Sequence, residues 1–324
     1  MSQAIALEQV AADAVDLVRA FRANGEVSFQ DVPLADARAN YLKACAANGV
    51  AEQTVAEVRT LEFAVAQGTA ALRVYRPAGI GAEALTPWVL FIHGGGWVIG
   101  NLDSHDSLCR SLANQSRASV VAVDYRLAPE HRFPVPLDDS LAALRYVRDN
   151  ASALGLDVDT AVVAGDSAGG NMATVLANHP AYQVPGVAFK AQVLFYPVTD
   201  LTASHPSYQQ ITQGFALTAK SMYWFREQYL PQGQDLLDAR LSPLLHAEGR
   251  VQPDLFILTV GLDPLADEGI AYASAAARAG TAVVHHHLPR HAHGLLTSAG
   301  KIASGRRLLT QAAQFIAERT QPLR

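Results

Sequence analysis

The chain has 324 residues, half of them hydrophobic, and a formal net charge of −5 from 25 Lys and Arg against 30 Asp and Glu. This suffices for one large domain with a sizeable core, while the slightly acidic balance and the lack of a basic cluster argue against a protein that binds nucleic acid or a membrane surface. No apolar run approaches the roughly 20 residues that span a bilayer, no signal-peptide pattern opens the chain, and Cys45 and Cys109 lie far apart, so we expect reduced thiols and a cytoplasmic protein.

Two helices are predicted before residue 50. The first carries apolar residues at helical spacing over residues 7–21 and stops at Asn24-Gly25. The second has Pro33 in its first turn and runs to Asn48-Gly49. Two strands, over residues 58–66 and 70–75, follow with Gly68 in the turn between them.

Short continuous apolar runs then alternate with helical stretches. The runs cover residues 88–92, 119–123, 161–164, 192–195, 255–258 and 281–284. Runs without polar alternation are typical of parallel strands that are covered on both faces, and their alternation with helices predicts a doubly wound α/β domain.

The interval over residues 199–251 breaks this rhythm, because it contains no predicted strand and one predicted helix that starts near Thr218. We interpret it as an insertion that lies over the carboxyl ends of the strands, together with the N-terminal helices. The alternative is an ordinary crossover helix with a long loop.

The pentapeptide Gly165-Asp166-Ser167-Ala168-Gly169 follows one predicted strand and precedes a predicted helix. This G-x-S-x-G pattern in a strand–turn–helix context is typical of a nucleophile elbow, where glycines permit a tight, strained turn that exposes the serine hydroxyl. We therefore predict Ser167 as a nucleophile. The alternative is a serine that caps the following helix.

The segment His93-Gly94-Gly95-Gly96-Trp97 directly follows the strand at residues 88–92. Consecutive glycines let backbone amides turn toward a developing negative charge, which such donors stabilise in acyl transfer. We predict Gly95 and Gly96 as oxyanion-hole donors together with the N–H of Ala168, while His93 and Gly94 shape the loop. A phosphate-binding loop is the alternative, but the Lys-Ser/Thr of that motif is missing.

Asp263 and a later histidine are predicted to complete the site. Asp263 follows the strand that begins at Leu255, and Pro264 next to it suits the first position of a helix that we expect to reach Ala279, so Asp263 could also cap that helix. Of the histidines that follow the strand at 281–284, we choose His293 as the base, because it lies on the connecting loop before the expected last helix at Gly294.

His291 is the alternative base. The neighbouring His285, His286 and His287 are expected to continue the strand. The pairs His285/His287 and His291/His293 also have the spacing of metal-binding pairs, but no cysteine or carboxylate accompanies them locally, so we expect no metal site.

In combination, these motifs resemble those of the bacterial hormone-sensitive lipase family of carboxylesterases. The matching segments, in the order of the family and spread over roughly residues 60 to 320, are His93-Gly94-Gly95-Gly96-Trp97, Asp124-Tyr125-Arg126-Leu127-Ala128-Pro129-Glu130, Gly165-Asp166-Ser167-Ala168-Gly169-Gly170-Asn171, Tyr196-Pro197, Asp263-Pro264-Leu265-Ala266-Asp267-Glu268-Gly269 and His293-Gly294. One departure is Leu295, where the family usually has an aromatic residue.

The resemblance implies an α/β-hydrolase fold, with a mostly parallel eight-stranded twisted sheet flanked by helices. It implies a catalytic domain over residues 51–198 and 252–324 and a small helical cap built from residues 1–50 and 199–251. It also implies a triad of Ser167, His293 and Asp263 without a cofactor, gives scaffold roles to residues 124–130 and Asn171, and suggests a homodimer formed through a sheet edge.

We therefore expect a carboxylesterase that cleaves small-molecule esters with short- to medium-chain acyl groups through an acyl-enzyme. Two alternatives remain at this point. One is a non-catalytic protein that binds a small ligand on the same fold, and the other is a hydrolase of amides or lactones.

Overall fold

The computed structural model describes residues 5–81 and 83–320; residues 1–4, on which the expectation of no signal peptide partly rests, lie outside this part. One sheet forms the centre, with strand order β1-β2-β4-β3-β5-β6-β7-β8. The strands are β1 (Glu57–Val65), β2 (Gly68–Arg76), β3 (Thr86–Ile92), β4 (Ser119–Asp124), β5 (Leu156–Asp166), β6 (Ala191–Phe195), β7 (Asp254–Leu262) and β8 (Val283–Ala292). β2 pairs antiparallel with β1 and with β4, and the other pairs are parallel, so the predicted mostly parallel eight-stranded sheet is confirmed.

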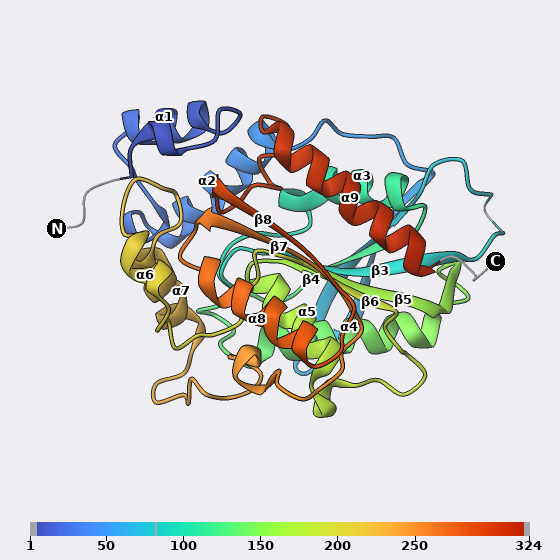
Figure 1. The fold of residues 1–324 in the computed structure, drawn as a ribbon. Coiled ribbons are helices and arrows are strands. Elements are labelled where there is room, and N and C mark those ends of the chain that lie inside the picture. The colour runs from blue at the N-terminus through green and yellow to red at the C-terminus, as the bar shows by residue number, and fades with distance from the viewer. Residues whose placement is uncertain (1–4, 82, 321–324) are drawn as a thin grey trace.

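Helices cover both faces of this sheet (Figure 1). On one face lie α3 (Asp106–Ser116) and α9 (Ala303–Thr320), and on the other lie α4 (Val135–Asn150), α5 (Ala168–Asn178) and α8 (Ala266–Arg278). The remaining α-helices are α1 (Val15–Ala23), α2 (Leu34–Asn48), α6 (Pro206–Gln210) and α7 (Ala219–Tyr229), and they gather at the end of the sheet toward which the β7 and β8 arrows point. Short 3-10 helices are η1 (Leu7–Gln9), η2 (Phe29–Asp31), η3 (Asp103–His105), η4 (Pro180–Tyr182) and η5 (Pro243–His246).

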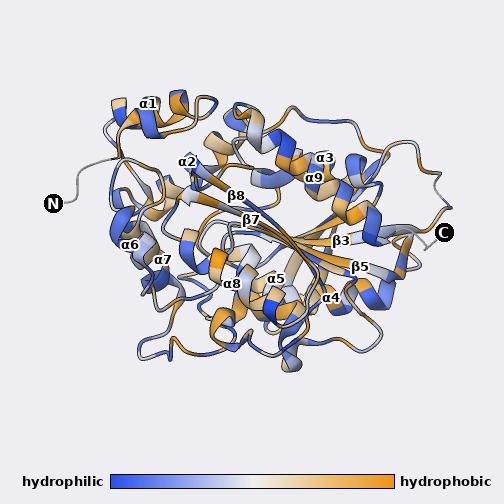
Figure 2. Ribbon diagram, viewed as in Figure 1, coloured by the Kyte–Doolittle hydropathy of each residue, from blue (hydrophilic) through white to orange (hydrophobic). Residues whose placement is uncertain are grey.

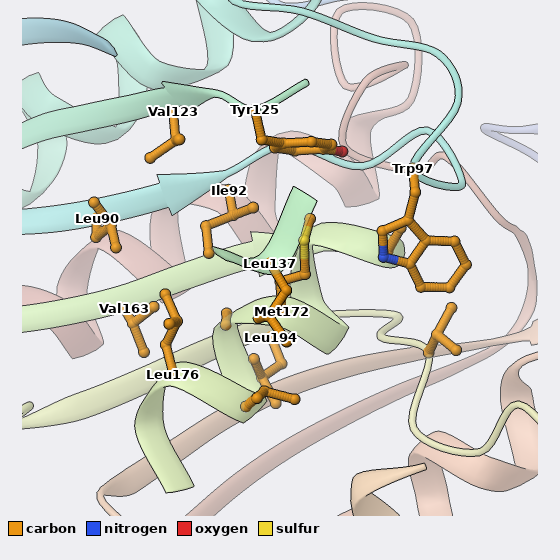
Figure 3. Close-up of a cluster of buried hydrophobic side chains, with 14 of the residues drawn as sticks. Leu90, Ile92, Trp97, Val123, Tyr125, Leu137, Val163, Met172, Leu176 and Leu194 are labelled. Carbon is orange, nitrogen blue, oxygen red and sulfur yellow. The ribbon is translucent and has the colours of Figure 1, made fainter. Parts of the chain in front are cut away.

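Successive residues of the central strands are buried in two separate cores. In β3, Leu90 belongs to the core beneath α4, α5 and α8, whereas its neighbour Phe91 belongs to the core beneath α3 and α9. Figure 3 shows the first core, in which Val163 of β5 lies near Leu176 of α5. Because both sheet faces are covered, the central strands read as continuous hydrophobic runs, and Figure 2 shows them in hydrophobic colours.

The first helix is shorter than predicted. Residues 7–21 form η1 and then α1, separated by a bend, because the Ala11 N–H donates to the Arg290 carbonyl at 2.8 Å instead of continuing a helix. The predicted stop is confirmed, since Gly25 has φ +87° just after α1. A tertiary contact thus overrides the helical spacing of the apolar residues.

The last helix begins at Ala303 and not near Gly294 as predicted. Gly294 has φ +80°, outside the right-handed helical region, and turns cover the residues that follow it. The Gly300 N–H donates to the Asn48 carbonyl at 2.8 Å, and a Cβ at Gly300 would lie 1.8 Å from the Gly49 carbonyl oxygen. This segment is therefore shaped by its contact with the end of α2.

Other predicted boundaries differ by a few residues. Pro33 precedes α2 as its N-cap, and α8 starts at Ala266 with Leu265 as its N-cap, so Asp263 does not cap that helix. β8 starts at Val283, later than predicted, and extends to Ala292.

The segment over residues 199–251 contains α6, α7 and η5 and no strand, as predicted, and Thr218 caps α7 by accepting a hydrogen bond from the Ser221 N–H. Cys45 and Cys109 are buried and not bonded to each other. Within the described residues, no helix has the length and apolarity that crossing a membrane requires.

A buried ion pair fixes the loop after β4 to α4. Arg126 donates to both carboxylate oxygens of Asp139, from Nε at 2.8 Å and from Nη2 at 2.7 Å, and Asp139 is 1% exposed. Removal of the Asp139 carboxylate leaves the Arg126 guanidinium without its partner. We therefore expect Asp139→Ala to lower the free energy of unfolding by about 3 kcal/mol, measured by urea denaturation. Asp149→Ala, which breaks the exposed pair with Arg148 on the same helix, should leave the midpoint unchanged, and equal losses in both variants would contradict this account.

Candidate active site

Ser167 occupies a sharp turn between β5 and α5. Its φ of +55° and ψ of −119° form a conformation that L-residues rarely adopt. The turn is packed so closely that a Cβ at Gly165 would lie 2.4 Å from the Gly169 carbonyl oxygen, and a Cβ at Gly169 would lie 1.9 Å from that of Ile92. Ser167 precedes α5, but its side chain makes no capping hydrogen bond, so the alternative of a helix cap is wrong.

The Ser167 hydroxyl contacts a histidine that in turn contacts a carboxylate. Nε2 of His293 lies 2.9 Å from Ser167 Oγ, and Nδ1 of His293 lies 2.7 Å from Asp263 Oδ2. Asp263 is fully buried and its other oxygen accepts the Leu265 N–H at 2.9 Å, so the carboxylate is held in place. With the Nδ1–H donated to Asp263, the Nε2 lone pair faces the Ser167 hydroxyl and can take its proton.

These three residues converge because of strand order. Ser167, Asp263 and His293 each directly follow a strand, β5, β7 and β8 respectively, and these strands run parallel in one sheet. Their carboxyl ends therefore meet at one edge of the sheet, where α/β proteins commonly bind ligands.

The other histidines of the cluster lie elsewhere. Nε2 of His291 is 3.0 Å from Oδ1 of Asp13, so the structure brings His293 and not His291 to Ser167. His285 and His287 both contact the Thr259 hydroxyl at 2.8 Å. In the described part of the chain, no group of three or more His, Cys, Asp or Glu side chains is arranged to hold a metal ion.

The glycine loop after β3 faces the same cavity as Ser167 and His293. Gly95 and Gly96 have φ of +116° and +59°; a Cβ at Gly95 would lie 2.1 Å from the Ile99 carbonyl oxygen, and one at Gly96 would lie 2.3 Å from the Phe225 ring. Both positions therefore require glycine. Across the turn, Ala168 is the first residue of α5, where an N–H has no partner within the helix.

Asp166 links the glycine loop to the serine turn. The Gly94 N–H donates to Asp166 Oδ1 at 2.7 Å, and Nε2 of the buried His105 lies 3.1 Å from the same oxygen. Burial alone would raise the pKa of Asp166, but the interaction with His105 and the hydrogen bond from Gly94 lower it overall. Sequence reasoning missed both roles, because Asp166 is a variable position of the pentapeptide and His105 lies outside every motif.

His93 packs beneath the glycine loop. Its ring stacks on Tyr125 with centroids 4.3 Å apart, and its Nδ1 lies 2.7 Å from the Gly94 carbonyl oxygen, contacts that suit the predicted loop-shaping role. Complete burial, with a smaller contribution from repulsion by His105, lowers the pKa of His93 to about 4.

A cavity of about 360 Å³ extends from Ser167 between two segments that are distant in sequence. Apolar side chains from the N-terminal segment and from the segment after β6 form much of its wall, among them Leu17, Phe21, Phe29, Phe215, Leu217 and Phe225. The site thus places the contacts of Ser167, His293 and Asp263 beside an apolar chamber.

The two segments are bonded to each other. The Ser28 hydroxyl donates to the Ala216 carbonyl at 2.6 Å, the Gly214 N–H donates to a Glu26 carboxylate oxygen at 3.0 Å, and the rings of Phe29 and Phe225 lie 5.3 Å apart. They therefore form one layer over the cavity.

Arg38 of α2 attaches this layer to the rest of the molecule. It donates to the Val98 carbonyl at 2.9 Å, to the Ala128 carbonyl at 3.0 Å, and to both carboxylate oxygens of Glu130 at 2.8 and 2.7 Å. Because Val98 directly follows the glycine loop, Arg38 joins that loop to the N-terminal segment.

Two further buried residues, Tyr196 and Glu268, lie in segments that match the family, but the sequence assigned neither of them a role at the site. The Tyr196 ring lies 4.5 Å from the His293 ring, and its hydroxyl accepts the Leu296 N–H at 3.2 Å. Glu268 is fully buried, accepts the Thr199 N–H at 2.6 Å, and has its pKa raised well above the usual value, chiefly by burial.

Comparison with known proteins adds independent findings. A family model described as alpha/beta hydrolase fold matches residues 89–297. The chain is 42% identical to ethyl acetate hydrolase of Pseudomonas putida over 70% of its own length and 72% of the relative, and 40% identical to carboxylesterase NlhH of Mycobacterium tuberculosis over 73% and 76%.

Solved structures resemble this chain over nearly its whole length. An alpha/beta hydrolase enzyme from the metagenome of Lake Arreo, Spain, superposes with a TM-score of 0.90 at 37% identity over 96% of this chain and 98% of that one. An esterase of Pyrobaculum calidifontis gives a TM-score of 0.85 at 33% identity over 95% and 98%.

The lowered pKa of His93 predicts a pH dependence of stability. Between pH 6.5 and about pH 4 the unfolded chain binds a proton at His93 that the folded protein excludes, so stability is fully present above pH 6.5 and falls toward pH 4. We expect this loss to reach about 3 kcal/mol relative to a His93→Gln variant, which lacks the titrating group. Urea unfolding of both proteins across this range tests it, and parallel stability curves would contradict the assignment.

Proposed function

We propose that this chain, because it belongs to the alpha/beta hydrolase fold family, uses that fold to hydrolyse carboxylic esters. The ester-hydrolase names of the two relatives support the reaction class. The finer proposal is a triad of Ser167, His293 and Asp263, as in the bacterial hormone-sensitive lipase family, acting on esters with short- to medium-chain acyl groups.

The observation that carries the proposal is the unbroken line of contacts from Asp263 through His293 to Ser167. In the reaction, Nε2 of His293 takes the Ser167 proton as Oγ attacks the ester carbonyl carbon. Asp263 keeps the imidazole oriented and stabilises its protonated form. His293 then gives the proton to the departing alcohol oxygen, which leaves an acyl group on Ser167.

Negative charge on the former carbonyl oxygen is stabilised by the amides of Gly95, Gly96 and Ala168. In the second half of the reaction, His293 takes a proton from water, whose oxygen attacks the acyl carbon. The Ser167 oxygen leaves with the proton from His293, and the carboxylic acid is released. This mechanism requires no cofactor.

We further propose that residues 1–50 and 199–251 act as a cap over a catalytic domain formed by residues 51–198 and 252–324. The contacts between Ser28 and Ala216 and the apolar chamber beneath them support this division. A chamber of about 360 Å³ favours short and medium acyl chains over long ones.

The test of the reaction uses p-nitrophenyl esters of graded acyl length. We expect turnover by the wild type, and a loss of kcat of about 10⁴-fold or more in Ser167→Ala and in His293→Gln, because the members of a triad act as a unit. Ser152→Ala, at an exposed serine far from the cavity, is the matched control.

Absence of wild-type turnover above Ser167→Ala for all chain lengths would refute the esterase proposal. Turnover that survives in His293→Gln would refute the base assignment alone.

Phe225 is the residue that we expect to limit chain length. Its ring packs on Gly96 and Phe29 and lines the cavity. Phe225→Ala should raise the ratio of kcat/KM for decanoyl over acetyl esters by about tenfold, since it removes apolar volume from the chamber wall. Tyr223→Ala, on the same helix but outside the cavity lining, should leave the ratio unchanged; an equal shift in both variants would argue against a local effect.

A further inference from the structure

His293 is carried by the end of an edge strand. β8 lies at one end of the strand order and pairs only with β7, and its last paired residue is Ala292, opposite Leu262. An edge strand has an open row of backbone groups on its outer side. The position of His293 therefore depends on what holds the outer side of β8.

The N-terminal segment before α1 holds that side. The Ala11 N–H donates to the Arg290 carbonyl at 2.8 Å. In return, the Arg290 guanidinium donates to the carbonyl of Val10 at 3.0 Å, to that of Gln9 at 3.1 Å and to that of Glu8. A backbone contact and a side-chain contact thus fasten the same short stretch to the end of β8.

Asp13 adds a third contact, which reaches two elements at once. Its Oδ1 lies 3.0 Å from Nε2 of His291, and its Oδ2 accepts the Ser304 N–H at 2.8 Å, at the start of α9. His291 is 7% exposed, whereas 28% of the Asp13 side chain is exposed, so this contact is half-buried. Burial alone would raise the pKa of Asp13, but the bonds from Ser304 and His291 lower it overall, which favours the carboxylate.

This contact lies against the wall of the active-site cavity. Ala14, next to Asp13, lines that cavity together with Ala292 and His293. Two histidines within three residues of this strand end thus make different contacts. His291 contacts Asp13, and His293 contacts Ser167.

We propose that Asp13 and His291 are positioning residues that fix the end of β8 and thereby hold His293 at hydrogen-bonding distance from Ser167. The proposal rests on the proposed function, because it gives His293 the role of base. Neither residue touches the reacting atoms. Without their contact, the end of β8 keeps its pairing with β7 and the bonds of Arg290 but loses its link through Asp13 to Ser304 of α9. A displacement of the base by a fraction of an ångström is enough to slow proton transfer.

A double-mutant cycle tests the proposal in the full-length protein. We expect Asp13→Ala and His291→Ala each to lower kcat for a p-nitrophenyl ester by about tenfold with KM changed less than twofold. The double variant should be no slower than the worse single variant, because both changes remove the same contact. His291→Gln, whose amide nitrogen can reach the place of Nε2, should recover most of the activity.

The matched control is Asp254→Ala, which breaks the contact of Arg319 with the start of β7 at the opposite end of the sheet. Like Asp13→Ala, this change removes a contact of α9 with the rest of the molecule, so it matches any purely structural effect of Asp13→Ala. It should leave kcat unchanged. All variants are assayed well below their melting temperatures.

A second readout does not depend on turnover. The proton on Nδ1 of His293, bonded to Asp263, is expected as a downfield resonance in proton NMR that disappears in His293→Gln. In Asp13→Ala this resonance should shift or broaden, and in Asp254→Ala it should not.

If kcat and the resonance both match the wild type in Asp13→Ala, or if the single effects on kcat simply add in the double variant, the proposal is overturned. If the wild type hydrolyses no ester while the resonance still responds to Asp13→Ala, the esterase assignment falls and the positioning role stands.

Discussion

The site depends on the close approach of two turns that leave no room for a side chain between them. β3 and β5 are neighbours in register, with Ile92 opposite Gly165, so the glycine loop and the serine turn leave the sheet side by side. A Cβ at Gly169 would collide with the Ile92 carbonyl, and one at Gly94 would lie 2.4 Å from the Asp166 carboxylate. Glycine at these two positions is therefore what allows the two turns to lie against each other next to Ser167.

The close approach of the glycine loop and the serine turn also explains why a charged side chain, that of Asp166, is buried next to the site. Asp166 must bring a carboxylate into a region shielded from water in order to hold the Gly94 N–H, and an isolated buried charge is unfavourable. His105, whose Nε2 lies 3.1 Å from this carboxylate, lowers the pKa of Asp166, while burial lowers the pKa of the neighbouring His93 to about 4. A Cβ at Gly96 would lie 2.3 Å from the Phe225 ring, so the covering layer and the glycine loop are in direct contact.

The features predictable from the sequence were those encoded locally. Both faces of the sheet are buried, so its strands appear as apolar runs, and the glycine triplet and the pentapeptide follow such runs because their geometry forbids other residues. His293 could be preferred to His291 because chain order placed it on a loop. By contrast, the bend at Ala11, the late start of the last helix and the roles of Asp13 and His105 arise from contacts between segments far apart in sequence, for which no local pattern exists.

The place of His293 at the end of an edge strand explains the contact of Asp13 with His291. Ser167 follows a strand with neighbouring strands on both sides, whereas His293 follows an edge strand, which has a neighbouring strand on only one side. A precise distance between the two residues therefore needs a second support on the outer side of β8, and the N-terminal segment is the part of the chain that lies there. Because the same segment continues into the cavity wall at Ala14 and Leu17, the element that shapes the chamber also carries the support of the base. The N-terminal segment thus takes part both in the wall of the cavity and in the contacts at the end of β8.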